Sequence, residues 1–263
     1  MLLRRLAALV AVTSMLVAAC GSTAASPLTD PKDILVKSIG ALQGLKTAHM
    51  HVDLSGSIKA DLTGAGSSAP IDLSGTTADL DVDLGAKSTH ISATVPALLG
   101  VTADVIVIGN DTYTKVSLLG TKYKKTSTTA LASLVPSGAG AIGSGSMTDP
   151  QQVLNDVKAA LDKLTTPPVK GADEKCGDQD CYKVTLTISA ADMSSAGNTL
   201  GTSVTGSGSV DVLVRKNDLV PSKAVVTINA GDQGTLNLTL TVSNVNGSVS
   251  IAAPPADQID TSQ

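Results

Sequence analysis

The 263-residue sequence contains no tryptophan, no phenylalanine and only three tyrosines. Proteins that hold single-stranded nucleic acids stack the bases on aromatic side chains, and this chain has too few rings for such a surface. Basic residues are also outnumbered, since 19 Lys and Arg against 23 Asp and Glu give a formal charge of -4. A negatively charged chain is a poor match for a phosphate backbone, so we expect no nucleic-acid partner.

Charge of either sign is scarce, whereas aliphatic residues are abundant. Charged residues make up 16% of the chain and hydrophobic residues 42%. This balance excludes an intrinsically disordered chain and predicts a packed fold. The length suits one large β domain or two smaller ones.

The N-terminus has the pattern of a secretion signal. Two arginines precede an apolar run over residues 6–19, and Cys20 follows directly. Such a run after a basic start is typical of a signal peptide, and it is shorter than the roughly 20 residues of a membrane-spanning helix. The residues around Cys20, VAACGS, resemble a bacterial lipobox. This resemblance implies that Cys20 carries a diacylglyceryl group and becomes the first mature residue.

We therefore expect a lipoprotein signal peptide over residues 1–19 and a lipidated tether over 20–28. An ordinary signal peptide with a chance cysteine is the alternative. Two or more acyl chains on one residue hold a protein at a bilayer almost permanently. The predicted location is the extracytoplasmic side of the cell membrane, with the cell wall or cell surface as the alternatives.

The other two cysteines agree with export. Cys176 and Cys181 bracket the turn-forming tetrapeptide Gly-Asp-Gln-Asp. A disulfide that closes this short loop is expected in an oxidising compartment. The alternative, a metal site, would need further ligands, and neither another Cys nor a His lies nearby in the sequence.

Helices are predicted by two Asp-Pro pairs, in which Asp caps the helix and Pro occupies its first position. Each pair precedes apolar residues spaced to form one stripe on a helix. Two weaker helical patterns lack such a cap. The expected helices, with the two capped ones first, cover residues 31–43, 150–164, 128–135 and 190–200.

Most of the remaining chain alternates apolar and polar residues with a period of two, most regularly over residues 235–242. This alternation predicts about nine to eleven antiparallel strands with one apolar face. A sheet of that width must curl, because strands lie about 4.8 Å apart. The fold class is therefore α+β, with a single strongly curved antiparallel β-sheet, a half-barrel, that wraps a few short α-helices. One domain is expected over 29–255, followed by a C-terminal tail over 256–263.

Histidines and aspartates at alternating positions raise the question of a metal site. His49 and His51 point to the same face of one predicted strand, so they are able to share a zinc ion. Asp53 or His90 would supply the third ligand. A solvated pair on a strand face is the alternative, and it is the interpretation we adopt, with no metal and no cofactor expected. The run Asp-Leu-Asp-Val-Asp over 79–83 lacks the Gly and Glu of a calcium loop and is interpreted in the same way.

Motifs for nucleotide binding and catalysis are weak. The sequence GAGAIG over 138–143 matches a dinucleotide fingerprint, but no strand leads into it and the next helix has its own cap. There is no nucleophile elbow, and three histidines offer little general-base capacity. We expect the protein not to be an enzyme, with a hydrolase as the disfavoured alternative.

Several segments, in this order, resemble the actinobacterial LppX/LprAFG lipoproteins, which share a fold with the LolA and LolB lipoprotein carriers. The lipobox cysteine is followed by a tether and an amphipathic helix, and later segments continue the similarity. These segments are GLKTAHMHV over 44–52, the Asp-Pro helix start at 149–150, YKVTLT over 182–187, and LTVSN with a later Ile-x-x-Pro within 239–255.

The resemblance implies a hydrophobic cavity that takes up the acyl chains of envelope lipids or glycolipids and carries them across the cell envelope. The implied partners are an acylated lipid or glycolipid, the membrane through the anchor, and an envelope transporter. Leu98 and Leu99 are candidates for the mouth of the cavity or for membrane contact. The candidates for its lining are Val105, Val107, Leu186, Ile188, Val212, Leu238 and Leu240.

The alternative function belongs to a different class of protein. The same apolar faces also suit a fully packed core without a cavity. In that case the chain would be a structural or regulatory surface lipoprotein that binds another envelope protein.

Overall fold

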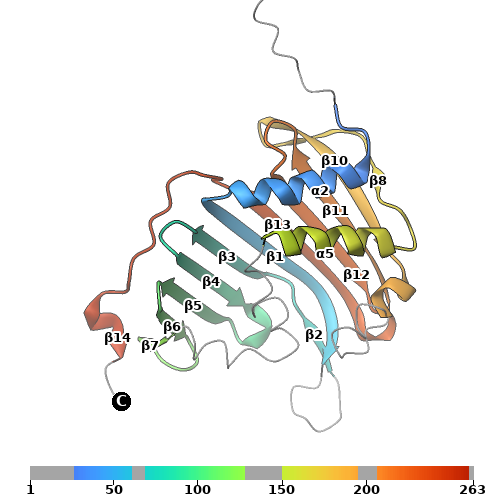
Figure 1. The fold of residues 1–263 in the computed structure, drawn as a ribbon. Coiled ribbons are helices and arrows are strands. Elements are labelled where there is room, and N and C mark those ends of the chain that lie inside the picture. The colour runs from blue at the N-terminus through green and yellow to red at the C-terminus, as the bar shows by residue number, and fades with distance from the viewer. Residues whose placement is uncertain (1–26, 61–68, 128–149, 195–205, 261–263) are drawn as a thin grey trace, which may run out of the picture.

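The computed structural model describes residues 27–60, 69–127, 150–194 and 206–260. The described strands form one sheet, and the helices α2 (Pro31–Ala41) and α5 (Pro150–Lys163) lie on one of its faces (Figure 1). We call this face the helix face and the opposite one the outer face. The sheet is curved and is not closed into a barrel, because β14 and β8 at its two ends do not pair. The predicted fold class is confirmed.

Ten strands have five residues or more, in agreement with the predicted number. They are β1 (Thr47–Ala60), β3 (Thr76–Asp83), β4 (Ser88–Val95), β5 (Val101–Ile108), β6 (Asp111–Val116), β7 (Tyr123–Ser127), β10 (Gln179–Ile188), β11 (Ser207–Arg215), β12 (Pro221–Asn229) and β13 (Gly234–Ser243).

Four shorter strands raise the total in the described ranges to fourteen. They are β2 (Ala69–Asp72), β8 (Val169–Lys170), β9 (Glu174–Cys176) and β14 (Ile259–Asp260). Strands of two to four residues are too short to show a period, so the sequence did not predict them. Short 3-10 turns accompany the strands, namely η1 (Leu42–Gly44), η2 (Pro96–Leu98), η4 (Gly231–Gln233) and η5 (Ala256–Gln258).

The strand order is β14-β7-β6-β5-β4-β3-β1-β13-β12-β11-β10-β8, with β2 beside β1 and β9 beside β10. Two meanders of neighbouring strands therefore meet at the β1–β13 pair. All pairs are antiparallel except β14 with β7. Residues 256–263 were expected to form a tail, but Ile259 pairs with Tyr123 and places β14 at the edge of the sheet.

Helix α2 begins as its cap predicts. The Asp30 carboxylate accepts hydrogen bonds from the backbone N–H groups of Lys32 and Asp33, at 2.8 and 3.1 Å. An ion pair of 2.9 Å between Lys32 and Asp162 links α2 to α5. The predicted helix over 128–135 and the cap of α5 lie outside the described residues. In the predicted helix over 190–200, residues 190–194 are helical and the rest lies outside the described ranges.

The core consists of two clusters on opposite faces of the sheet. On the helix face, Ile34 of α2 is fully buried against β10 and β11, and Leu161 of α5 joins it. On the outer face, Ile106 packs with Tyr113 and Tyr123 beneath the C-terminal segment. The first cluster consists of Ile34, Leu35, Leu161, Tyr182, Val184 and Val214.

Candidate functional site

An unbroken row of aliphatic residues crosses the helix face. In an antiparallel pair, residues directly opposite each other project from the same face of the sheet. Following this register from β10 to β5 across eight strands gives only aliphatic side chains. The row is Val184, Val212, Ala224, Leu240, Val52, Ala78, Ala93 and Ala103.

The exposure of this face differs from strand to strand. Val184 and Val214 are fully buried beside the two helices. Beyond them, Leu240 and Val52 are half-buried, and Ile91 on β4 is 36% exposed. Over the described residues, the helices therefore cover the β10–β11 side more completely than the β1–β5 side.

The size of the side chains changes along the same row. Valine and leucine occupy β10, β11 and β13, whereas alanine occupies β3, β4 and β5, at Ala78, Ala93 and Ala103. Since alanine projects less far from the sheet than valine or leucine, we expect the helix face to be recessed along this row at these three strands. A recessed aliphatic surface suits flexible hydrocarbon better than it suits a rigid polar ligand.

All seven residues predicted to line a cavity lie on the helix face, and all are half-buried. Two belong to β5 and five to β10–β13, so β1, β3 and β4 separate the two groups. The apolar residues of those three strands were not among the predicted lining residues, although the same period of two marks them. These are Met50, Val52, Leu54, Leu80 and Ile91, which the register places on the helix face. The role of the seven as a cavity lining stays a prediction.

The two mouth candidates lie in the loop between β4 and β5. Leu98 is 44% exposed and Leu99 95% exposed. A second exposed pair, Leu118 and Leu119, lies in the loop between β6 and β7 at the same end of the sheet. Sequence analysis missed this pair, although the dipeptide Leu-Leu followed by Gly occurs in both loops.

The three histidines lie on the outer face and pair with aspartates. Nδ1 of His49 lies 2.9 Å from Asp81, and Nε2 of His90 lies 3.2 Å from Asp104. The pKa of His51 is raised, chiefly because its ring is hydrogen-bonded to Asp79. Within the described ranges, no group of three or more His, Cys, Asp or Glu side chains is arranged to hold a metal ion. The histidines therefore form close pairs with aspartates on the outer face of the sheet.

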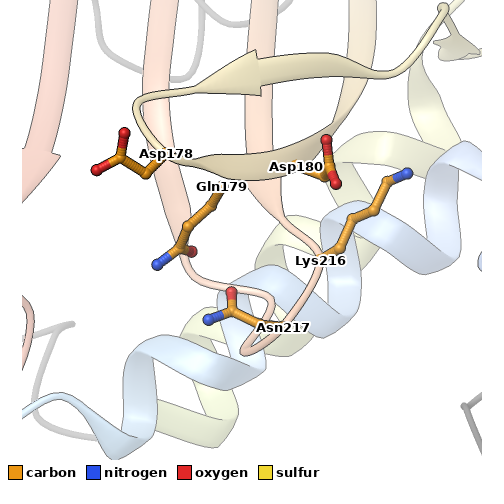
Figure 2. A pocket seen from close by; sticks show the side chains of 5 residues that line it. All are labelled: Asp178, Gln179, Asp180, Lys216 and Asn217. Carbon is orange, nitrogen blue, oxygen red and sulfur yellow. The ribbon is translucent and has the colours of Figure 1, made fainter.

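A polar pocket of about 440 Å³ lies at one end of β10 and β11 (Figure 2). Figure 2 shows that its walls come from two neighbouring turns, one between β9 and β10 and one between β11 and β12. A hydrogen bond from Lys175 lowers the pKa of Asp180, so this carboxylate stays charged. A pocket of this chemistry is unsuited to an acyl chain. The lining residues are Asp178, Gln179, Asp180, Lys216 and Asn217.

The hairpin that forms one wall of this pocket is closed by a disulfide between Cys176 and Cys181, as predicted. The two residues lie in neighbouring strands with their Cα atoms 5.9 Å apart, which suits a disulfide. Cys181 is fully buried in β10, so the bond holds β9 to this strand. Cys20, the lipidation candidate, lies outside the described residues.

Comparison with known proteins supports the fold. No protein-family model matches the chain, and neither does any curated protein sequence. Among solved structures, the lipoprotein LppX of Mycobacterium tuberculosis matches with a TM-score of 0.52 and 18% identity, over 84% of this chain and 98% of that one. LprF from Mycobacterium bovis matches with 20% identity over 85% of this chain and 96% of that one, at a TM-score of 0.47.

A LolA superfamily protein from Nitrosomonas europaea is more distant, with a TM-score of 0.27 and 12% identity over 88% of this chain and 97% of that one. The match to LppX shows that the chain has the LppX fold. The resemblance seen in the sequence is thereby confirmed for the fold. In the described part of the chain, no helix combines the length and apolar character needed to cross a bilayer.

Proposed function

We propose that this chain is a lipid-anchored lipoprotein of the cell envelope that binds the acyl chains of lipids or glycolipids on its helix face and carries them across the envelope. The observation that carries the proposal is the aliphatic row across eight strands, buried at β10 and half-exposed toward β5. Its register places aliphatic side chains side by side across eight strands, and part of that surface is accessible to solvent.

The energetics of lipid transfer explain why such a surface is useful. Each methylene exposed to water costs roughly 0.8 kcal/mol, so a chain of about 16 carbons costs on the order of 10 kcal/mol. An aliphatic surface that covers the chain lowers this cost during transfer. The strands are long enough for the task, since eight residues span roughly 26 Å, comparable with an extended acyl chain.

The match to the lipoprotein LppX supports an extracytoplasmic location and a lipid-related role, and the sequence around Cys20 supports the anchor. The eight-residue row across the helix face consists of aliphatic side chains only, and these cannot act as acids, bases or nucleophiles. We therefore propose a non-enzymatic role. The acyl chains of a lipid or glycolipid are the proposed ligand, and an envelope transporter is the proposed partner that supplies it.

Native mass spectrometry tests the proposal directly. The protein is produced in an actinomycete without residues 1–19 and with Cys20→Ala, so that no anchor lipid adds to its mass. We expect a lipid-sized adduct that organic extraction removes. A protein that is free of adducts in every preparation would contradict lipid binding and favour the packed, protein-binding alternative.

Two neighbouring substitutions on β4 locate the ligand. Ala93→Trp fills the recess on the helix face, and we expect it to reduce the adduct at least about tenfold, since a bound chain and an indole ring compete for the same space. Thr94→Trp is the matched control, because Thr94 lies next in the strand and projects from the outer face between Thr77 and Thr102. Equal adducts in both variants would place the ligand elsewhere.

A further inference from the structure

Four exposed leucines gather at one end of the sheet. Leu98 and Leu99 lie between β4 and β5, and Leu118 and Leu119 lie between β6 and β7, with exposed fractions of 44, 95, 68 and 74%. Since β5 and β6 are antiparallel neighbours, the start of β5 and the end of β6 lie at the same edge. We call the two loops, residues 96–100 and 117–122, the leucine edge.

Hydrogen bonds hold the two loops of the leucine edge side by side. The backbone N–H of Ser117 donates to the carbonyl of Thr102 at 2.9 Å, and the N–H of Thr102 donates to Oγ of Ser117 at 3.0 Å. Each loop is also closed within itself, by Gly100 N–H to Pro96 at 3.2 Å and by Leu119 N–H to Val116 at 2.8 Å. The leucines are therefore presented together by two short and internally bonded loops.

Folding does not account for leucine at these positions. Leu99 has a φ of 61°, in the left-handed region where glycine costs less than a branched side chain. Its side chain is almost fully exposed, so no burial offsets that cost. Large apolar side chains that protrude together are a mark of a binding surface.

The charge of the leucine edge identifies the kind of partner. The two loops contain no acidic residue and one lysine, Lys122, although acids outnumber bases in the whole chain. Lys124, next to the loop on β7, is also exposed. Aliphatic tips beside basic side chains are complementary to a bilayer with anionic headgroups, where the tips enter the acyl region and the lysines remain at the surface.

We propose that the leucine edge docks on a lipid bilayer with anionic headgroups. This inference rests on the proposed function and deepens it, because docking would bring one end of the aliphatic helix face to the membrane. An acyl chain that moves between bilayer and protein at this edge would avoid most of its exposure to water. The anchor at Cys20 would keep the protein near the membrane, and the leucine edge would set its orientation there.

The chain contains no tryptophan, so the fluorescence of a single introduced tryptophan can be measured without background from other tryptophans. Leu99→Trp is made in the full, lipidated chain, which is inserted into vesicles of phosphatidylcholine and phosphatidylglycerol with brominated acyl chains. We expect Trp emission at shorter wavelength than in water and strong quenching by bromine. Leu119→Trp, made separately, gives the same readout from the other loop if the first variant does not fold.

Leu84→Trp is the matched control. Leu84 is 55% exposed in the turn that precedes β4, whereas the leucine edge follows β4, so the two sites lie at opposite ends of one strand. We expect the indole at 84 to emit as in water and to escape quenching. Equal quenching at 99 and 84, or none at either 99 or 119, would overturn the proposal.

Further outcomes separate this proposal from its alternatives. Lys122→Ala, added to Leu99→Trp, should weaken quenching on anionic vesicles, and an unchanged signal would overturn the assignment of anionic headgroups. A blue shift that depends on protein concentration and needs no vesicles would indicate a second copy of the chain as the partner and overturn docking on a bilayer.

Quenching at 99 without a lipid adduct in mass spectrometry would contradict the proposed carrier function alone, whereas an adduct without quenching would contradict the docking alone.

Discussion

Oδ1 of Asp79 lies 2.7 Å from Nδ1 of His51, its direct partner across the β1–β3 pair. The same oxygen lies 3.5 Å from Nε2 of His49. His51 also faces Asp53 through its other ring nitrogen, at 3.4 Å. Carboxylates and imidazoles therefore alternate along the outer face, and each of these two rings has a carboxylate near both nitrogens.

The pH dependence of this arrangement follows from the direction of the shift. The pKa of His51 lies above its ordinary value of 6.5, mainly through the hydrogen bond with Asp79. The contribution of the His51–Asp79 pair to the free energy of unfolding is therefore fully present below pH 6.5. It is lost as the pH rises through the folded-state pKa of His51. In an NMR titration, Asp79→Asn should lower the pKa of His51, because the substitution removes the carboxylate that is hydrogen-bonded to its ring. An unaltered His51 titration would contradict the pairing.

The contact of α2 with the sheet should dominate the stability of the helix face. Ile34 is fully buried in the cluster with Val184 and Val214. Ile34→Ala leaves a cavity and should lower the free energy of unfolding by about 2 to 5 kcal/mol, measured by urea denaturation. Leu84→Ala truncates an aliphatic side chain of a residue that is 55% exposed, and it should change the free energy of unfolding by less than about 0.5 kcal/mol. Similar losses in the two variants would show that α2 does not pack as described.

Two glycines near the same turn should differ sharply in their tolerance of alanine. Gly231 and Gly234 both have positive φ, 59° and 117°. A Cβ at Gly234 would collide with the carbonyl oxygen of Ser57 in β1, whereas a Cβ at Gly231 meets open space. Gly231→Ala should cost about 1 to 2 kcal/mol of unfolding free energy from backbone strain alone. Gly234→Ala should lower the free energy of unfolding clearly more, with both variants measured by urea denaturation. Equal losses in the two variants would contradict the close approach of β1 and β13.

Reduction of the disulfide should destabilise the protein modestly. Cys176 and Cys181 are separated by five positions, so the bond closes a short loop and removes little entropy from the unfolded chain. On the chain-entropy model, losing it costs about 2 kcal/mol. The paired substitution Cys176→Ser with Cys181→Ser should lower the midpoint of thermal unfolding accordingly, and dithiothreitol should have no effect on that variant. A larger loss would point to the buried position of Cys181, where serine leaves a polar hydroxyl without water.

Much of the fold was predictable from the sequence because the sheet has one apolar and one polar face. Leu236, Leu238 and Leu240 alternate with polar residues, so both the strand and its inward face follow from period two alone. The same rule placed all seven cavity candidates on one face. The start of α2 was equally predictable, since the hydrogen bonds of the Asp30 cap are local.

Features that depend on distant parts of the chain were beyond this reasoning. Strand β14 exists because Ile259 meets Tyr123, and two residues carry no period. The leucine edge needs the β5–β6 register to bring Leu99 and Leu118 to one end. The pairing of His51 with Asp79 likewise depends on the β1–β3 register, which the sequence does not reveal.

The β1–β13 pair has a consequence for how the chain is assembled. Strand β1 begins at Thr47, and its partner begins at Gly234, whereas the pairs from β3 to β7 and from β10 to β13 join consecutive strands. The N-terminal meander is therefore complete long before β13 has been synthesised, with one edge of β1 open along most of its length. An open strand edge recruits other strands, so this intermediate is vulnerable to aggregation. Until residues 234–243 arrive, a chaperone that covers β1 would do for the nascent protein what β13 does for the finished one.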